Sequence, residues 1–283
     1  MITETGSHGY IFRRRKYWFD MPRARYPTMD AFLHGGKSML LAYDQGFEHG
    51  PSKDFNDKNV DPAYIMEIAS KGGFNGIVFQ KGLAEKYYDG RVPLIVKTNA
   101  KAGLTKGEPN SMQNCSVEYA VTSLGAKAVG YTIYLGSELE GEMFQEFGRI
   151  QEKAHEHGIP AITWVYPRGQ AVTNDTSKEI VAYAARVGLE LGADAVKIKY
   201  TGDPQSFSWA VKSAGKAHVY MSGGPKAPTD QDFLNQVRGV MQAGATGLAV
   251  GRNVWQNDDP IKMANYLRQV IFEMKPVESV MQA

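Results

Sequence analysis

The feature that most constrains this fold is a repeated pattern of a short apolar segment, a loop and an amphipathic helix, which begins at Lys37. Apolar residues three and four apart indicate helices, as over residues 64–69 and 180–187, while short β-branched runs indicate strands. The expected strands are Met39–Tyr43, Gly76–Gln80, Pro93–Lys97, Ala128–Ile133, Ala161–Val165, Ala195–Lys199, His218–Met221 and Gly247–Val250. Several helices end in a glycine that leads directly into the next strand, as at Gly192-Ala193. Such endings are typical of the αβ loops of parallel α/β proteins.

Eight strand–helix units in roughly 245 residues match a (β/α)₈ barrel in number and in size. A doubly wound open sheet is the alternative, but neither GxGxxG nor GxxxxGK[ST] follows the first strand. The sequence therefore predicts the α/β class, with a single (β/α)₈ (TIM) barrel over residues 36–283. Residues 1–35 are expected to be an N-terminal extension, in which Pro22 and Pro27 interrupt any long helix. We expect it to pack against the base of the barrel or a neighbouring subunit.

Charge and composition argue against several partners. The net charge of +2 gives no reason to expect nucleic acid or an anionic membrane. The basic run Arg13–Lys16 is expected to be a solvated or subunit-contacting face, and a nucleic-acid-binding interpretation rests on it alone. No stretch approaches the apolar length that spans a bilayer. The only cysteine, Cys115, fits a reducing compartment, so we expect a cytoplasmic protein.

Two lysines lie at the end of the strand expected over residues 195–199. Side chains alternate along a strand, so Lys197 and Lys199 share one face while Val196 and Ile198 take the other. Burial and a neighbouring cation both lower the pKa of an ammonium group, and only the free amine is nucleophilic. The pair is therefore a candidate for Schiff-base chemistry. Solvated lysines on an edge strand are the alternative.

Other polar side chains fall at the C-terminal ends of the strands, where the active sites of such barrels form. Asp44 ends the first strand and His49 follows in its loop, while Trp164, Tyr166 and Arg168 end the fifth strand. Tyr166, polarised by nearby cations, is the expected acid/base, and Asp44 could orient or deprotonate a substrate hydroxyl. Simpler roles stay open, namely core packing for Tyr166 and Trp164 and a helix cap for Asp44. His49 either contacts a phosphate or hydroxyl or hydrogen-bonds within its loop.

A phosphate site is predicted after the seventh and eighth strands, where these barrels commonly hold phosphate. The backbone N–H groups of Gly223, Gly224 and Gly251 can approach an anion closely, because glycine has no Cβ. Arg252 adds a bidentate donor. A substrate anchored there would place its carbonyl near Lys197. No cluster of His, Cys and Asp has the spacing of metal ligands, so we expect neither a metal nor a cofactor.

At these positions the sequence resembles the archaeal-type class I fructose-1,6-bisphosphate aldolases, the DhnA-like family. The matching segments are Leu41–Pro51, Val78–Tyr88, Trp164–Gly169, Ala193–Gly202, Met221–Pro225 and Val250–Asn253. The resemblance implies a metal-independent lyase that makes or cleaves fructose 1,6-bisphosphate through dihydroxyacetone phosphate and glyceraldehyde 3-phosphate. It also implies a homo-oligomer, a decamer built from pentameric rings.

The resemblance further implies roles for individual residues. Lys197 would be the Schiff-base residue and Tyr166 the proton donor. Residues implied to line the substrate are Asp44, Gln45, His49, Trp164, Arg168 and Lys199, and those implied to hold a phosphate are Ser222, Gly223, Gly224, Gly251 and Arg252. The family commonly has a histidine where this chain has Gln45, a difference that could alter contacts to substrate hydroxyls.

Three other functions on this scaffold are alternatives. Two are enzymes of similar type: an aldolase-like synthase that feeds aromatic amino-acid precursors, and a thiolase acting on a phosphorylated dione. Their phosphate loops would look alike, but residues 43–51 and 164–168 favour the sugar bisphosphate aldolase. The third is a catalytically silent barrel that binds a sugar phosphate. The presence of both Lys197 and Tyr166 argues against it.

Overall fold

The structure is a computed structural model, and it describes residues 26–50 and 54–282. The extension predicted over residues 1–35 is therefore described from residue 26 onward. The basic run Arg13–Lys16 and the helix-interrupting Pro22 lie outside the described residues. Within the described ranges, no helix is both long enough and apolar enough to cross a bilayer.

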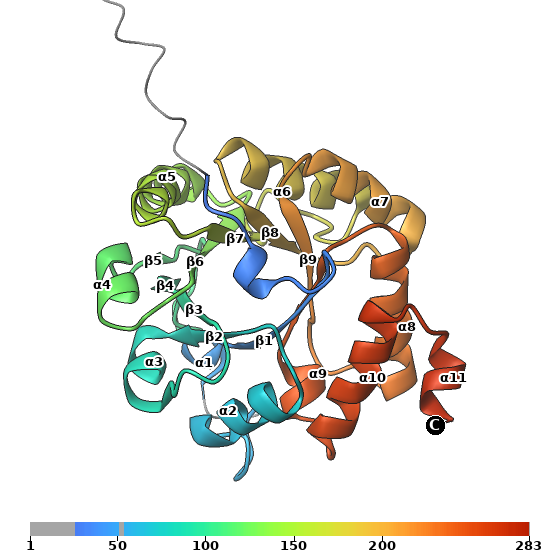
Figure 1. The fold of residues 1–283 in the computed structure, drawn as a ribbon. Coiled ribbons are helices and arrows are strands. Elements are labelled where there is room, and N and C mark those ends of the chain that lie inside the picture. The colour runs from blue at the N-terminus through green and yellow to red at the C-terminus, as the bar shows by residue number, and fades with distance from the viewer. Residues whose placement is uncertain (1–25, 51–53, 283) are drawn as a thin grey trace, which may run out of the picture.

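Eight parallel strands form a closed barrel, which is the predicted architecture (Figure 1). The strands are β1 (Ser38–Tyr43), β2 (Gly76–Gln80), β3 (Leu94–Lys97), β6 (Ala128–Leu135), β7 (Ala161–Pro167), β8 (Ala195–Ile198), β9 (His218–Ser222) and β10 (Gly247–Val250). Each pairs with the next in this order, and β10 closes the ring on β1. All eight predicted strands are confirmed, with ends that differ by one or two residues at most. Their burial on both faces is usual for a parallel sheet that helices cover.

Helices surround the barrel in an outer ring (Figure 1). They are α2 (Pro62–Lys71), α3 (Lys81–Tyr87), α4 (Val117–Thr122), α5 (Glu140–Glu156), α6 (Lys178–Glu190), α7 (Pro204–Ser213), α8 (Asp230–Gln242) and α10 (Pro260–Phe272). The shorter helices are α1 (Gly46–His49), α9 (Arg252–Trp255) and α11 (Val277–Met281). Side-chain caps fix where several of them begin, as where Ser177 accepts a hydrogen bond from the Ile180 N–H at the start of α6.

The barrel interior is closed at its N-terminal end by a short 3₁₀ helix, η1 (Asp30–Phe32), which lies across the centre of the ring in Figure 1. Phe32 is fully buried, and a Cβ on Gly76 would lie only 2.8 Å from its ring. Met29 and Leu40 belong to the same interior cluster. This part of the predicted extension therefore packs against the base of the barrel. Contact with a neighbouring subunit stays a prediction.

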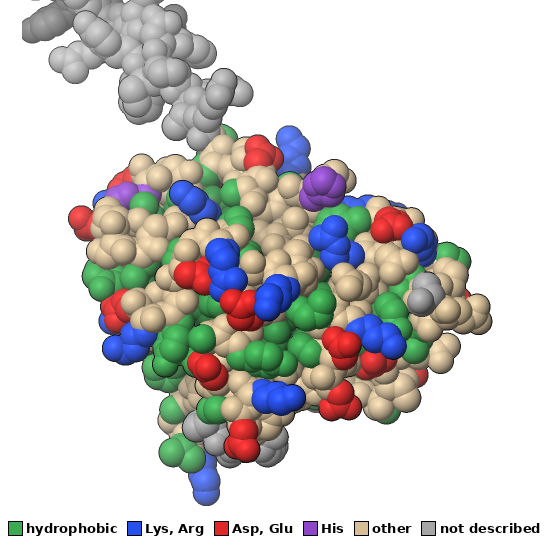
Figure 2. Space-filling view, turned by 60° about the horizontal axis from the view of Figure 1, so that its bottom comes forward, with side chains coloured by type: hydrophobic (Ala, Val, Ile, Leu, Met, Phe, Trp, Pro, Cys, Tyr) green, Lys and Arg blue, Asp and Glu red, His purple; other side chains and the backbone are tan. Residues whose placement is uncertain are grey.

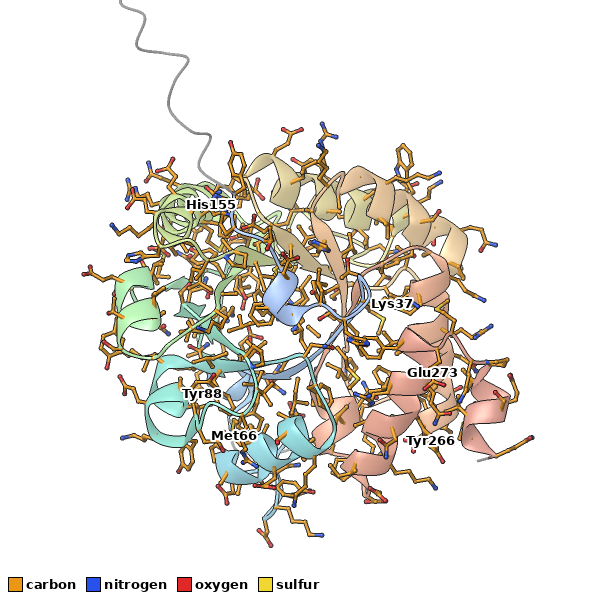
Figure 3. The ribbon with its side chains drawn as sticks, in the orientation of Figure 1. Lys37, Met66, Tyr88, His155, Tyr266 and Glu273 are labelled. Atoms are coloured by element: carbon orange, nitrogen blue, oxygen red, sulfur yellow. The ribbon has the colours of Figure 1, made fainter. Side chains whose placement is uncertain are left out.

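A second core lies between the barrel and the helices, where side chains fill the space (Figure 3). Met66 on α2 and Tyr266 on α10 belong to it. Lys37, just before β1, donates a hydrogen bond of 2.8 Å to the carbonyl of Ile271 at the end of α10. On the outer surface, Figure 2 shows basic and acidic side chains interspersed, in keeping with the small net charge.

The segment between β3 and α4 holds a small sheet that the sequence did not predict. β4 (Asn99–Ala100) pairs antiparallel with β5 (Met112–Gln113). Two-residue strands carry no readable alternation of apolar and polar residues, so periodicity cannot reveal them. In the connecting loop, Glu108 accepts hydrogen bonds from the backbone N–H groups of Glu138 and Gln170. These bonds tie the loop to the segments that follow β6 and β7.

Candidate active site

The C-terminal ends of the barrel strands surround a cavity of about 440 Å³. Every residue that the sequence predicted for the site lines this cavity. These residues are Asp44, Gln45, His49, Trp164, Tyr166, Arg168, Lys197, Lys199, Ser222, Gly223, Gly224, Gly251 and Arg252. They follow or end β1, β7, β8, β9 and β10, so the closure of the barrel brings them together.

Lys197 lies near the end of β8 and is only 5% exposed. Its Nζ atom lies 5.1 Å from the centre of the Trp164 ring. Burial lowers the pKa of Lys197 from 10.5 to about 8, the Asp44 carboxylate opposes this shift, and the Lys97 ammonium group reinforces it. Lys197 is therefore not a solvated lysine on an edge strand. Part of the amine is therefore uncharged near neutral pH.

A second buried lysine, Lys97 at the end of β3, was not among the predicted site residues. It is 5% exposed, and it lines the same cavity. Its Nζ lies 3.6 Å from Asp44 Oδ2, 3.4 Å from the Asn99 carbonyl oxygen and 5.4 Å from the centre of the Trp164 ring. Burial lowers the pKa of Lys97, and the charge of Asp44 opposes that shift. Asp44, Lys97 and Trp164 thus form one contact group.

The cations that lower the pKa of Lys197 are Lys97 and Arg168, whereas the predicted neighbour was Lys199. Lys199 lines the cavity, but it lies beyond the end of β8, and its ammonium group pairs with Asp175. A signal for Lys97 was present in the sequence. Ile95, two residues earlier, belongs to the interior cluster of the barrel, and side chains two apart on a strand share a face.

Tyr166, on β7, lies beside Arg168, whose guanidinium carbon is 4.9 Å from the centre of the tyrosine ring. Burial raises the pKa of Tyr166, and the Asp44 carboxylate raises it further, against the opposing charge of Arg168. The nearby cations therefore do not lower the pKa of this hydroxyl, because the free-energy cost of burying a phenolate exceeds the stabilisation that these cations give it. Tyr166 stays protonated and is suited to donating a proton.

Arg168 is held by a carboxylate from the loop after β1. Its Nη1 lies 3.3 Å from Glu48 Oε2, and the Tyr134 hydroxyl donates a hydrogen bond to Glu48 Oε1. Burial raises the pKa of Glu48, but the Tyr134 hydrogen bond and the charge of Arg168 outweigh burial, so the pKa is lowered overall. Glu48 is therefore a carboxylate that holds Arg168 beside Tyr166. Glu48 was not among the predicted site residues, although it lies in the segment Leu41–Pro51 that carries the resemblance, and it is 120 residues from Arg168 along the chain.

His49 lies near two carboxylates, with Nδ1 3.6 Å from Asp54 and Nε2 3.8 Å from Glu48. Burial lowers the pKa of His49, and the charge of Arg252 acts in the same direction. Because the ring also lines the cavity, the structure is compatible with both interpretations of this residue: contacts near its own loop, and contact with a ligand.

The loops after β9 and β10 meet at the cavity, where the phosphate site was predicted. Gly224 has a φ of +62°, a left-handed conformation that favours glycine. A Cβ on Gly251 would lie 2.9 Å from the Ala42 carbonyl oxygen, so this position leaves no room for a larger residue. Gly223 differs from the expectation for an anion donor. Its N–H already donates to the Ala249 carbonyl at 3.3 Å and continues the strand pairing.

The first residues of α9 join these two loops. Arg252 Nη1 lies 3.4 Å from Asp54 Oδ2, so a buried carboxylate orients this guanidinium. Asn253 was not predicted as a site residue. Its Nδ2 donates to the carbonyl oxygens of Gly223 and Pro225 at 2.7 and 2.9 Å. Its only sequence signal is its place directly after Gly251 and Arg252.

Comparisons with known proteins identify the family of this chain. A family model described as DeoC/LacD family aldolase matches residues 38–257. The chain belongs to the DeoC/LacD aldolase family. The class 1 fructose-bisphosphate aldolase of Thermoproteus tenax is 60% identical over 243 residues, which cover 85% of this chain and 92% of that protein. The class 1 fructose-bisphosphate aldolase of Halobacterium salinarum is 45% identical over 251 residues, which cover 87% and 94%.

Solved structures agree with this membership of the DeoC/LacD aldolase family. An archaeal fructose 1,6-bisphosphate aldolase superimposes with a TM-score of 0.84 at 59% identity, covering 86% of this chain and 97% of that one. Another archaeal fructose-1,6-bisphosphate aldolase, whose catalytic Lys is covalently bound to the carbinolamine intermediate of the substrate, gives a TM-score of 0.83 at 58% identity and the same coverage. The resemblance and the barrel predicted from the sequence are both confirmed.

The site of this DeoC/LacD-family barrel combines three kinds of group. It holds a buried amine of lowered pKa on Lys197, a protonated phenol on Tyr166 and the carboxylate side chain of Asp44. The described residues contain no group of three His, Cys, Asp or Glu side chains that could hold a metal ion. Together the amine, phenol and carboxylate can attack a carbonyl group and move the protons that this attack requires.

Proposed function

We propose that this protein is a class I, Schiff-base fructose-1,6-bisphosphate aldolase. It cleaves fructose 1,6-bisphosphate reversibly to dihydroxyacetone phosphate and glyceraldehyde 3-phosphate. The observation that carries the proposal is the amine of Lys197, which is buried in the cavity with its pKa lowered to about 8. The class 1 aldolases that are 60% and 45% identical support the choice of substrate.

The first step forms an imine on Lys197. The neutral amine attacks the ketone carbon, a C–N bond forms, and a proton passes from nitrogen to the former carbonyl oxygen, which gives a carbinolamine. This hydroxyl takes up a further proton and leaves as water, and the nitrogen lone pair closes the iminium. Tyr166, whose raised pKa keeps it protonated at neutral pH, supplies that proton. The relative solved with its Lys bound to a carbinolamine supports this step.

The second step breaks the carbon–carbon bond. A base removes the proton from the hydroxyl group next to that bond, the electron pair of the bond moves into the iminium, and an aldehyde leaves as the enamine forms. Asp44 orients or deprotonates that hydroxyl, since it lines the cavity beside both lysines. Tyr166, reprotonated from solvent after the first step, gives a proton to the enamine carbon. Water then adds to the iminium carbon, the C–N bond breaks to release the ketone and restore the Lys197 amine, and Asp44 loses its proton to solvent.

A phosphate anchor keeps the ketone near Lys197. The N–H groups of Gly224 and Gly251 are suited to bind it, together with the Ser222 hydroxyl and Arg252. Gly223 shapes the loop and does not bind the phosphate through its N–H, because that N–H donates a hydrogen bond to the Ala249 carbonyl. The rest of the substrate lies along the remaining cavity side chains, which are Gln45, His49, Trp164, Arg168 and Lys199.

The remaining assignments have narrower support. Cys115 is a buried free cysteine, which fits the cytoplasm. Tyr183 on α6 and Trp209 on α7 are 55% and 52% exposed, and an interface between copies would bury them. We therefore include a cytoplasmic homo-oligomer in the proposal, a decamer or pentamer. The catalytic unit is residues 36–283. Light scattering on the purified full chain would check the number of subunits.

The test of the function is the intact mass of the protein after borohydride reduction with dihydroxyacetone phosphate, followed by peptide mapping. One adduct on the peptide that contains Lys197 is the expected result. No adduct, with inorganic phosphate still bound, would indicate a silent sugar-phosphate-binding barrel. An assay of fructose 1,6-bisphosphate cleavage, in which the release of glyceraldehyde 3-phosphate is measured, distinguishes the aldolase from the synthase and thiolase alternatives.

A further inference from the structure

Two buried lysines lie in one cavity near one carboxylate, and their surroundings differ. Lys97 Nζ has Asp44 Oδ2 at 3.6 Å, the Asn99 carbonyl oxygen at 3.4 Å and the Trp164 ring centre at 5.4 Å. Each of these groups attracts a cation. Lys197 Nζ lies near the same ring, at 5.1 Å, but forms no ion pair with any residue in the described part of the chain.

A hydrogen-bond network holds the carbonyl group that faces Lys97. The Asn99 amide donates to the carbonyl oxygens of Ser111 and Thr132 at 2.8 and 2.9 Å, and its own oxygen accepts from the Thr132 N–H at 2.8 Å. Gln80 Nε2 donates to the Asn99 carbonyl at 3.1 Å. This network fixes the carbonyl that faces Lys97, so the ammonium group meets a rigid acceptor.

We propose that Lys97 is a positioning residue for the Schiff-base reaction: its ammonium group occupies Asp44 and thereby leaves Lys197 as the uncharged nucleophile of the pair. The inference rests on the proposed function, because it gives Lys197 the reacting amine. Lys97 touches neither reacting atom in this scheme. It acts through the carboxylate that it holds and through its own charge.

Removal of Lys97 would raise the pKa of Lys197 in two ways. A cation that disfavours the Lys197 ammonium group would be lost, and Asp44 would be left to attract that ammonium group instead. Both effects raise the pKa of Lys197. Other groups near the Lys197 amine stay in place in this comparison. The charges of Glu48 on α1 and Arg168 after β7 also act on that amine, and Tyr166, Lys199 and Arg252 line the same cavity.

The test is the rate of imine formation as a function of pH. The full chain is mixed with dihydroxyacetone phosphate, quenched with excess borohydride at timed intervals and weighed intact. For the wild type, the rate should rise with a midpoint of about 8. For Lys97→Met and Lys97→Gln, the midpoint should move upward by about one pH unit, so the rate at neutral pH falls about tenfold and recovers at high pH. Lys127→Met, at an exposed lysine before β6, is the matched control.

The pH midpoints of the Lys97 variants decide whether Lys97 acts through its charge. A lower rate at every pH with an unmoved midpoint would make Lys97 merely structural and overturn the inference. Lys97→Arg keeps the charge, so its midpoint should stay near the wild-type value, and a midpoint as high as that of Lys97→Met would also overturn it. Should none of the variants fold, a wild-type midpoint near the ordinary 10.5 would overturn it, because Lys197 would then not be the uncharged amine of the pair. No adduct in the wild type at any pH would instead remove the proposed function itself.

Discussion

The two ends of the barrel interior are lined by the same strands but differ in chemistry. Inward side chains toward the base are apolar, as at Leu40, Ile95, Ile162 and Ala195. Two or four residues further along the same four strands, the mouth carries Asp44, Lys97, Tyr166 and Lys197. Burying a polar or charged side chain is costly unless it is paired or used. The base therefore supplies stability and the mouth supplies chemistry, a division that substitutions can test in order of their expected effect on turnover.

The largest loss of turnover is expected at the mouth, for Lys197→Met. Without the amine there is no iminium to accept the electrons of the breaking bond, so cleavage should fall to background, on the order of 10⁶-fold. Binding of inorganic phosphate, measured by calorimetry, should be largely retained, because the loops after β9 and β10 are untouched. Lys216→Met, at an exposed lysine before β9, is the control. Turnover equal to that of the wild type would remove Lys197 from the mechanism.

The next largest loss is expected for Tyr166→Phe, also at the mouth. The imine should still form and be trapped by borohydride, while steady-state cleavage slows by about 10²–10⁴-fold because the proton donor is missing. Tyr266→Phe, in the outer core on α10 (Figure 3), removes a hydroxyl from a buried tyrosine far from the cavity and should keep full turnover. If Tyr166→Phe turned over at the wild-type rate, another group would have to move the proton.

The sequence was most informative where a rule depends on neighbours along the chain. Periodicity and the glycines at helix ends predicted all eight strands, and strand parity put Lys197 and Lys199 on one face, in keeping with the cavity that both of them line. The predicted site residues line one cavity because strand C-terminal ends meet in any such barrel. These features follow from backbone geometry alone.

The sequence was least informative about which charged groups meet across the barrel. Lys97 contacts Asp44 from a strand two positions away in the sheet, and Glu48 reaches Arg168 from 120 residues away. No local pattern encodes such pairs. The raised pKa of Tyr166 has the same origin, because it depends on burial in the folded barrel, which outweighs the nearby cations.

An intermediate effect is expected where base and mouth meet, for Gly130→Ala on β6. A Cβ there would lie 2.3 Å from the Trp164 ring, which lies under both lysines. Overpacking should cost about 1–3 kcal/mol of stability, and displacement of the ring should slow turnover by up to about 10²-fold. Gly148→Ala on α5 has open space around its Cβ and serves as the control. Full turnover in Gly130→Ala would mean that the position of the ring is unimportant for the reaction.

The smallest effect on turnover is expected at the base, for Phe32→Ala, although its cost in stability is large. Phe32 is fully buried in the cluster that closes the N-terminal end of the barrel, so its removal should cost about 3–5 kcal/mol in the free energy of unfolding. Turnover per folded active site, counted by the borohydride adduct on Lys197, should be unchanged, because the mouth is built on the opposite ends of the strands. Tyr87→Ala, at an aromatic residue 39% exposed at the end of α3, should change neither quantity much. If turnover per folded site fell together with stability in Phe32→Ala, the two ends would be coupled through the strands, and the division between base and mouth would be wrong.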